Sequence, residues 1–385
     1  MPRLARRAAL AAAVAAAFVA STAAATPAVA PRTPRVEAPA YFVQSAVDGT
    51  VLAQRAAASP RAIASITKLM TVLVALEHLS LDDVVTVPRL ATKVGEASVP
   101  LRAGERITVR ELVEASLVPS ANDAATTLAY AAADGSVRRF VSWMNAKAAE
   151  LGLQDTHFVT PHGLDRPGHV SSARDVVKLA RVALANPVIR RMAASETAEV
   201  AGQELGTTDD LLSSFPPLVA GKTGHTDDAG WTEVAEARRG SVTIFASVLG
   251  DPSREQRNAD LRSLLSWALR RYHRVLAVDA SRVYAVAATG YGRPAVHLVA
   301  RRSVARVQLD TRALVERIVA PTAVALPVVR GEKLGEVRVY ERGRLVALSP
   351  LVAAESIAKP DTLGRVRWYA TRTLHRLRSF VPFAS

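Results

Sequence analysis

The stretch ASITKLMTVLVAL, residues 64–76, places a serine and a lysine three positions apart at the start of an apolar run. Lysine is rare in this chain, which holds 42 arginines and only 7 lysines. If residues 65–78 form a helix, Ser65 and Lys68 project from one face of its first turn and can share a proton. A neutral amine can take the proton of a serine hydroxyl, whereas a guanidinium cannot. The pair therefore predicts a nucleophilic serine with Lys68 as its base.

A second Ser-x-x-Lys occurs at Ser356 and Lys359, but Pro360 follows it directly and ends any helix there. We interpret this second copy as a chance match. The start of a helix at Ser65 has a further use, because its free backbone N–H groups can stabilise the oxyanion that forms when a carbonyl is attacked.

Two further short elements extend the pattern. Ser120-Ala121-Asn122 stands at a corner between two predicted helices, and Lys222-Thr223-Gly224 lies in a predicted strand. A second cation within a few ångströms of Lys68 disfavours protonation of its amine and lowers its pKa, which gives Lys222 a physical role. Lysine thus fills both basic positions in an arginine-rich chain.

The composition excludes several classes of function. The chain has no cysteine, so thiol catalysis, disulfides and Cys-bound zinc are excluded. Its formal net charge of +14 would suit nucleic acid or an anionic membrane. No nucleic-acid-binding motif accompanies the charge, so we expect no nucleic-acid partner. We also expect no metal and no cofactor, and we interpret His157 and His162 as structural because they lack metal-ligand partners nearby.

The N-terminus has the pattern of a secretory signal peptide. Three arginines in MPRLARR precede an alanine-rich apolar run that ends in small residues, and we place the cleavage after Ala25. An uncleaved membrane anchor is the alternative, because the run is near spanning length. Both interpretations export the rest of the chain, to the outer face of the cytoplasmic membrane or to the cell wall.

The patterning of the remaining chain predicts an α+β fold of two units. After a linker at residues 26–39, a hairpin is expected around Asp48-Gly49, and three strand-like runs and a helix at 253–273 end the first unit, residues 40–273. Strands at both ends, enclosing helices in the middle, predict a sheet assembled from distant parts of the chain. Its further helices are expected in TVRELVEASLV with Thr108 as N-cap, NDAATTLAYAA, SVRRFVSWMNAKAAEL ended by Gly152, and SSARDVVKLARVALAN ended by Pro187.

The C-terminal part of the chain predicts a small β domain and a basic helix. Strand-like alternation runs through residues 274–350, and residues 351–385 are predicted to form a linker and an amphipathic helix at 362–381. With Trp368 and Tyr369 near its polar boundary, this helix can lie on an anionic membrane. Docking on the β domain is the alternative. The expected apolar face consists of Val366, Ala370, Leu374, Leu377 and Val381.

In the order Ser-x-x-Lys, Ser-x-Asn and Lys-Thr-Gly, with intervals near 50 and 100 residues, the three motifs are the signature of penicillin-recognising serine enzymes. From about residue 40 to 273 the chain resembles the low-molecular-mass penicillin-binding proteins, the serine-type D-alanyl-D-alanine carboxypeptidases. The resemblance implies their β-lactamase/transpeptidase-like fold, an antiparallel sheet with a helical subdomain. The blocks that carry it, in family order, are IASITKLMT, LVPSANDAA, FVTPHGLD, GHVSSARD and GKTGHTDDAGW.

The resemblance also implies roles for the motif residues. Ser65 would be acylated with Lys68 as the base, while Ser120 and Asn122 would relay protons and hold the substrate amide. The backbone N–H groups of Ser65 and His225 would form the oxyanion hole.

Substrate recognition is implied in the same way. Lys222 and Thr223 would grip the terminal carboxylate of the substrate, and Gly224 would let the substrate lie flat against the strand. Arg257 matches a family arginine that helps to bind the carboxylate. A solvated helix charge is the alternative for Arg257.

Two positions depart from the family pattern. Thr160 stands where an asparagine often precedes Pro-x-Gly-Leu, and residues 206–212, GTTDDLL, lack the usual asparagine and basic residues. The second departure bears on substrate affinity and rate.

The implied function is removal of the terminal D-Ala from peptidoglycan stem pentapeptides, with covalent inhibition by β-lactams. A β-lactamase is one alternative, but no Glu-x-x-Leu-Asn string lies between Asn122 and Lys222. A cell-wall- or membrane-binding module without catalysis is another. The motifs fit water, a second stem peptide or a bridge amine as acyl acceptor, and the resemblance favours water.

Overall fold

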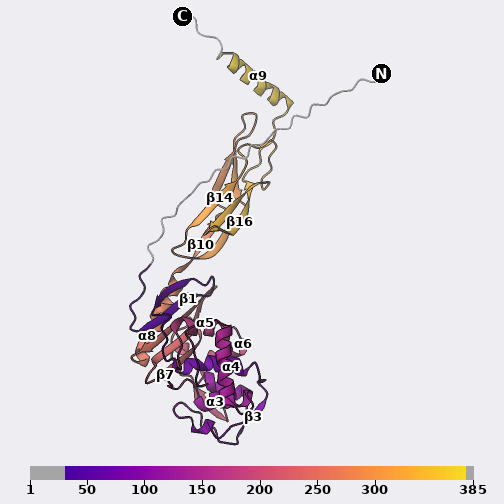
Figure 1. Cartoon of the computed structure of the whole chain (residues 1–385). Coiled ribbons are helices and arrows are strands. Elements are labelled where there is room, and N and C mark those ends of the chain that lie inside the picture. The colour runs from indigo at the N-terminus through magenta and orange to yellow at the C-terminus, as the bar shows by residue number, and fades with distance from the viewer. Residues whose placement is uncertain (1–30, 379–385) are drawn as a thin grey trace, which may run out of the picture. The chain divides into compact units, whose positions relative to one another are not determined.

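The structure is a computed structural model that describes residues 31–378. The predicted signal peptide, residues 26–30 of the predicted linker and the end of the predicted tail helix lie outside the described residues. The described chain forms two compact units, one from Pro31 to Tyr272 and one from His273 onward (Figure 1). The division falls next to the boundary that the sequence pattern places after residue 273.

The first unit is built on a five-stranded antiparallel sheet in the order β2-β1-β9-β8-β7. The predicted hairpin is present, with Gly49 at a positive φ of 71° in its turn. β1 pairs with β9, so the two ends of this unit meet in the middle of the sheet, and β7 is an edge strand. The strands are β1 (Ala40–Ser45), β2 (Val51–Arg55), β7 (Leu218–Thr226), β8 (Gly230–Arg239) and β9 (Val242–Asp251).

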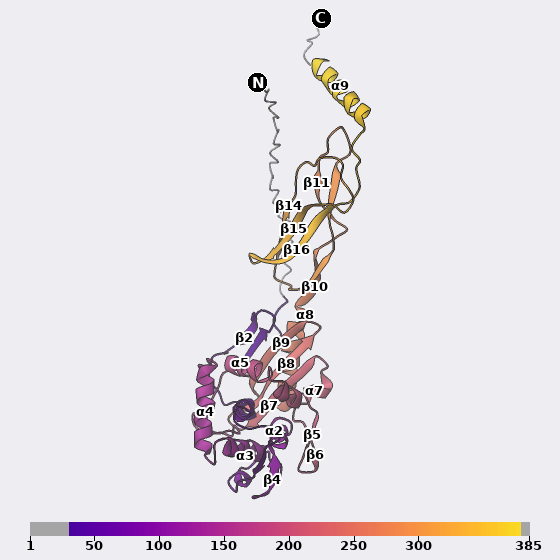
Figure 2. The same ribbon diagram turned by 90° about the vertical axis from the view of Figure 1, so that its right-hand side faces the viewer.

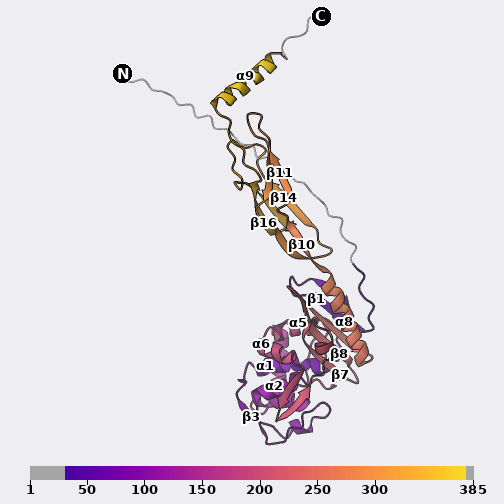
Figure 3. The ribbon, with the colours of Figure 1, turned by 180° about the vertical axis from the view of Figure 1, so that it is seen from behind.

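Helices cover both faces of this sheet. Ser247 of β9 donates to the carbonyl of Ala173 at the start of α5, whereas Glu233 of β8 contacts Arg257 of α8. Val234, which follows Glu233 in β8, pairs with Ser247, so these two side chains point to the same face of the sheet. Successive side chains of a strand point to opposite faces, so Glu233 points to the other face. α5 and α8 therefore lie on opposite faces, and Figure 3 shows α8 along β8. The helices are α1 (Lys68–Ala75), α2 (Val109–Leu117), α3 (Asn122–Ala132), α4 (Val137–Glu150), α5 (Ala173–Ala183), α6 (Pro187–Ala193), α7 (Leu211–Ser214) and α8 (Arg254–Arg270).

Smaller elements complete the first unit. Two pairs of short antiparallel strands accompany the helical block. One 3₁₀ turn precedes α1, and the other lies between the two strands of the first pair. They are η1 (Ala64–Thr67), β3 (Val84–Thr86), η2 (Ala91–Lys93), β4 (Arg106–Thr108), β5 (Thr197–Val200) and β6 (Gln203–Gly206).

Local signals explain several helix ends, and one prediction about them is wrong. Thr108 caps α2 in a capping box with Glu111, as the sequence predicts. The sequence pattern predicts that Pro187 ends the preceding helix, but α5 ends at Ala183 and Pro187 is the first residue of α6, with Asn186 as N-cap. Proline suits a first helical position because its φ is already helical and its missing N–H would have no partner there.

The second unit contains a five-stranded antiparallel sheet in the order β11-β12-β16-β15-β14 and a two-stranded sheet of β10 and β13 (Figure 2). β15 and β16 form the hairpin around Arg342-Gly343, and β16 continues to Ala353, beyond the predicted domain end at residue 350. The strands are β10 (Tyr272–Val278), β11 (Val283–Ala287), β12 (Val296–Ala300), β13 (Val304–Leu309), β14 (Leu314–Val319), β15 (Lys333–Glu341) and β16 (Arg344–Ala353).

The tail forms the helix α9 (Thr362–Arg378), and the last residues of the predicted helix lie outside the described range. Trp368 and Tyr369 contact Tyr291 of the β11–β12 connection, with ring centroids 5.5 and 6.2 Å away. Leu363 and Val366 nevertheless remain 77% and 60% exposed. The helix thus touches the β domain through aromatic rings and leaves apolar side chains in solvent. Within residues 31–378, no helix combines the length and the apolar character needed to cross a membrane.

Candidate active site

Ser65 lies in the 3₁₀ turn η1 directly before α1, rather than in the first turn of one continuous α-helix as predicted. The turn is strained, because Ala64 has a φ of +46°, a region that residues with a Cβ rarely adopt. Gly163 packs directly on it: a Cβ on Gly163 would lie 2.0 Å from the Ala64 carbonyl oxygen. Only glycine fits there, so Gly163 allows the block FVTPHGLD to pack against the turn that carries Ser65.

Lys68 is fully buried and reaches three of the predicted site residues. Its Nζ lies 2.6 Å from Ser65 Oγ, 2.6 Å from Asn122 Oδ1 and 3.4 Å from Ser120 Oγ. Burial lowers the pKa of Lys68 well below its ordinary value, and the charge of Lys222 lowers it further. The amine is therefore driven towards the neutral form that a general base requires.

The corner between α2 and α3 presents Ser120 and Asn122 to this amine. Ser120 has a positive φ of 67°, and Asn122 is the first residue of α3. The Asn122 side-chain amide donates to the Gly95 carbonyl at 3.0 Å, which leaves its oxygen turned towards Lys68. The backbone conformation of this corner thus directs the side chains of Ser120 and Asn122 towards Lys68.

Lys222 approaches the same serine from β7. Its Nζ donates to Ser120 Oγ at 2.9 Å and to the Thr223 carbonyl at 2.9 Å. Burial is the main cause that lowers the pKa of Lys222 to about 7; Asp209 opposes this shift and Arg257 adds to it. Ser120 therefore sits between two buried amines, an arrangement that can pass a proton from one side of the site to the other.

Gly224 has a structural role in the packing of β7, in addition to the role that the resemblance implies. A Cβ there would lie 2.7 Å from Thr232 Oγ1, 2.9 Å from Ala64 Cβ and 2.9 Å from the Ser65 backbone nitrogen. The missing side chain lets β7 approach the turn that carries the nucleophile. Of the neighbours of Gly224 in β7, Thr223 is hydrogen-bonded to Thr208 at 2.7 Å, and His225 is exposed and packs on Trp231.

Arg257 is not a solvated helix charge, because only 1% of its side chain is exposed. Its Nε lies 3.0 Å from Glu233 Oε2 and its guanidinium stands 5.7 Å from the Trp231 ring centroid. Burial raises the pKa of Glu233 well above its ordinary value, while Arg257 opposes that rise. The hydrogen bonds of Arg257 in the described chain go to Asn258 rather than to a motif residue. Its influence on the described site is electrostatic, through Lys222.

Sequence reasoning missed several polar residues around the site. Asp209 and Thr208 belong to the stretch 206–212 that departs from the family pattern, and that departure was the available signal. His169 lies in the block GHVSSARD, which was its available signal, whereas Glu233 had none because it is a single polar residue in an ordinary-looking strand. His162 is mostly buried, and burial followed by the charge of Lys68 lowers its pKa to about 3.

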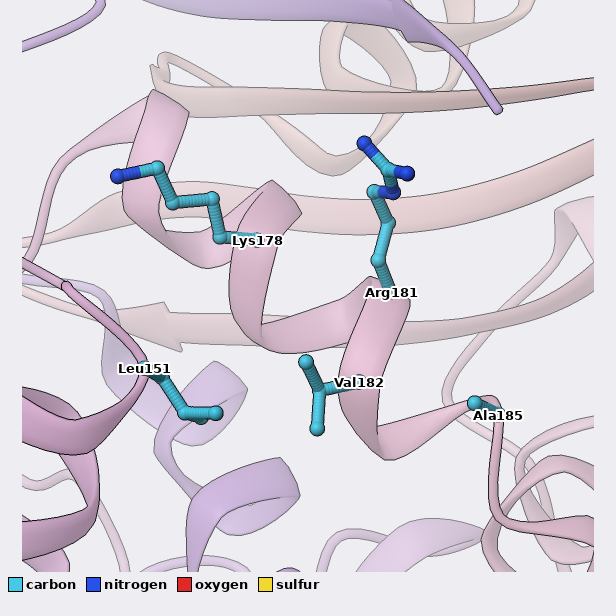
Figure 4. Close-up of a pocket in the computed structure, with 5 residues that line it drawn as sticks. All are labelled: Leu151, Lys178, Arg181, Val182 and Ala185. Carbon is cyan, nitrogen blue, oxygen red and sulfur yellow. The ribbon is translucent and has the colours of Figure 1, made fainter. Parts of the chain in front are cut away.

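Two hollows lie outside the cluster of motif residues. One of about 410 Å³ lies at the end of β7, where His225, Trp231 and Arg61 contribute to its lining. The other, about 460 Å³, lies beside α5 and contains no predicted site residue (Figure 4). Among residues 31–378 no group of three or more His, Asp or Glu side chains could hold a metal ion.

Comparisons with known proteins identify the family to which the chain is similar. The family described as D-alanyl-D-alanine carboxypeptidase matches residues 26–253. The curated carboxypeptidase DacD of Salmonella typhimurium is 31% identical over 357 residues, covering 88% of this chain and 91% of that protein. Among solved structures, penicillin binding protein 6B from Escherichia coli has a TM-score of 0.63 and 29% identity, covering 84% of this chain and 97% of that one. A point mutant of the Streptomyces K15 DD-transpeptidase has a TM-score of 0.59 and 30% identity, covering 62% of this chain and 99% of that one.

Proposed function

The chain belongs to the D-alanyl-D-alanine carboxypeptidase family, and we propose that it removes the terminal D-Ala through an acyl-enzyme on Ser65. The observation that carries the proposal is the buried amine of Lys68, 2.6 Å from Ser65 Oγ. In its neutral form this amine takes the hydroxyl proton as Oγ attacks the carbonyl carbon of the penultimate D-Ala. The peptide C–N bond then breaks, the departing D-Ala amine receives a proton, and water releases the acyl group from Ser65.

β7 is the strand on which the substrate would lie. Within the described sheet it pairs with β8 alone, so its other edge can accept an extended peptide as an added strand. The substrate carboxylate would face Lys222 and Thr223, and the oxyanion would bind the backbone N–H groups of Ser65 and His225. Gly224 keeps this edge close to the nucleophile, as its contacts with Ala64 and Ser65 indicate.

Ser120 is the residue placed to carry the proton to the leaving group. It contacts Lys222 at 2.9 Å and Lys68 at 3.4 Å, so the proton taken from Ser65 can pass from Lys68 to Ser120 and on to the D-Ala amine. Asn122 would hold Lys68 through its side-chain oxygen. It would hold the substrate amide through the side-chain N–H that does not donate to Gly95. Arg257 would act indirectly, because its positive charge opposes protonation of Lys222.

Mass spectrometry of the intact protein with penicillin tests the role of Ser65. We expect a mass increase of one penicillin, located on the peptide that contains Ser65, and D-Ala release from a D-Ala-D-Ala peptide. The Ser65→Ala variant should show neither. D-Ala release by the Ser65→Ala variant at the wild-type rate would refute the proposal.

A second candidate activity, transfer of the acyl group to an amine, differs from hydrolysis in the acyl acceptor. Water is our choice because the matched family and the curated relatives are carboxypeptidases. The likeness to a solved DD-transpeptidase is the observation that favours an amine acceptor. An assay with an added acceptor amine decides between them. It compares the yield of cross-linked product with the yields of free D-Ala and shortened peptide.

We also infer that the protein works outside the cytoplasm, on peptidoglycan, with α9 against an anionic membrane surface. The charge distribution supports this: residues 273–378 hold 19 basic and 8 acidic side chains, whereas residues 31–272 hold 27 of each. The whole positive excess of the described chain is thus in the second unit, and Leu363 and Val366 of α9 are exposed beside its arginines.

Co-sedimentation with vesicles tests the tail. Each basic residue near an anionic bilayer contributes about 1 kcal/mol, so replacing Arg365, Arg367 and Arg372 by glutamine should weaken binding to phosphatidylglycerol vesicles by roughly 100-fold. Vesicles of neutral lipid serve as the control. Unchanged binding by the triple variant would contradict the inference.

A further inference from the structure

The turn that carries Ser65 is held in place by a segment far away in the sequence. We call residues 160–169 the bracket segment. Thr71 of α1 donates to the Pro161 carbonyl at 2.5 Å, and Gly163 packs against the Ala64 carbonyl. Since Ala64 has an unfavourable positive φ, the turn keeps its shape only because its surroundings impose it.

The same segment also reaches β7. Asp165 accepts hydrogen bonds from Thr226 Oγ1 at 2.6 Å and from the Asp228 backbone nitrogen at 3.1 Å. The bracket segment therefore contacts both walls of the site, the turn with the nucleophile and the end of the strand on which the substrate would lie.

His169 ends this segment, and its hydrogen bonds determine its tautomer. Nδ1 accepts from the backbone N–H groups of Val159 and Thr160, at 3.1 and 3.3 Å. The ring proton must then be on Nε2, which lies 2.8 Å from Thr67 Oγ1 and donates to it. The side chain is 4% exposed, and burial lowers its pKa to about 4, so the imidazole is neutral near pH 7.

Thr67 is the point at which this hydrogen bond acts on the catalytic pair. It is the last residue of η1, two positions after Ser65 and directly before Lys68. A shift of Thr67 moves the backbone of both partners, and a misplacement of about 1 Å can cost roughly 100-fold in rate.

We propose that His169 is a positioning residue for acylation: its hydrogen bond to Thr67 holds η1 so that Ser65 Oγ stays beside the amine of Lys68. This inference rests on the proposed role of Ser65 as nucleophile. It assigns His169 no contact with substrate and no proton transfer. Its effect is on the geometry of the pair, and thus on the rate of the covalent step rather than on binding before it.

Two substitutions separate the two hydrogen-bonding functions of the ring. The Oδ1 of His169→Asn takes the place of Nδ1 and can satisfy Val159 and Thr160, but the side chain is too short to reach Thr67. The amide of His169→Gln extends as far as Nε2 and can donate to Thr67. If His169 only stabilised its own loop, the asparagine variant would be the better substitute.

The experiment measures penicillin acylation by stopped flow, which separates the first-order acylation rate from the dissociation constant of the preceding complex. We expect His169→Asn to lower the acylation rate at least 10-fold with an unchanged dissociation constant, and His169→Gln to stay within about 3-fold of wild type. Melting temperatures of both variants show whether the rates merely follow stability. Equal rates for the two variants, or rates that follow their melting temperatures, would overturn the proposal.

A double-mutant cycle with Thr67→Val tests whether Thr67 is the connection. We expect Thr67→Val to lower the acylation rate as much as His169→Asn, and the double variant to lose no more than either alone. Additive losses would contradict it. If the wild-type protein forms no adduct on Ser65, the proposed function itself fails. An adduct on Ser65 without a difference between the His169 variants defeats only the positioning role of His169.

Discussion

Replacing Gly224 by alanine tests the close approach between β7 and the nucleophile turn. The new Cβ would lie 2.9 Å from both Ala64 Cβ and the Ser65 nitrogen, whereas ordinary contacts begin at about 3.4 Å. The two backbones must therefore separate by about 0.5 Å or more, at the strand that carries Lys222. Because about 1 Å of misplacement can cost roughly 100-fold in rate, we expect acylation by penicillin to fall by about 10-fold or more.

Gly206→Ala is a matched control for this substitution. Gly206 also lies in a strand of the first unit, its φ is not in the left-handed region, and nothing lies within 4 Å of the position of an added Cβ. Acylation by the Gly206→Ala variant should equal that of wild type. The assay is the second-order rate of adduct formation, followed by mass spectrometry. If Gly224→Ala reacted with penicillin as fast as the control but lost only D-Ala-D-Ala peptide turnover, the glycine would serve the substrate and our reasoning would be wrong.

Three further predictions concern buried charges. Lys68→Arg should lower the acylation rate by about 10²–10⁴-fold, because guanidinium keeps the positive charge and cannot act as a base; the same adduct assay measures this. Lys222 has a pKa near 10.5 when unfolded and about 7 when folded, so the unfolded state binds more protons between these values. The free energy of unfolding should therefore rise with pH in that range, and the difference between wild type and Lys222→Met in urea titrations should show this slope. Arg257→Ala should lower the free energy of unfolding by up to about 3–5 kcal/mol at a pH at which Glu233 is ionised, because the carboxylate is then buried without its partner. Adding Glu233→Gln should recover part of this loss in urea denaturation.

Most elements of the first unit follow from local signals. Thr108 and Glu111 indicate the start of α2, and Asp48-Gly49 indicates the first hairpin, since caps and turns depend on neighbouring residues. Predictions failed where a local signal has two meanings. Pro187 can follow one helix or begin the next, and only the packing of α6 decides between them.

Residue type and spacing are enough to predict the chemistry available to this protein: two serines, an asparagine and two lysines in the right order, in a chain whose basic residues are mostly arginine. No coordinates are needed for that conclusion. The folded chain is needed to show that Ser65, Ser120 and Asn122 meet around the buried amine of Lys68. It is also needed to show that Gly163 and Gly224 make room for a strained turn and that Arg257 faces a buried carboxyl group. Close approach and the pKa of a buried group depend on desolvation and on neighbours from distant parts of the chain, and neither can be read from a local stretch of sequence.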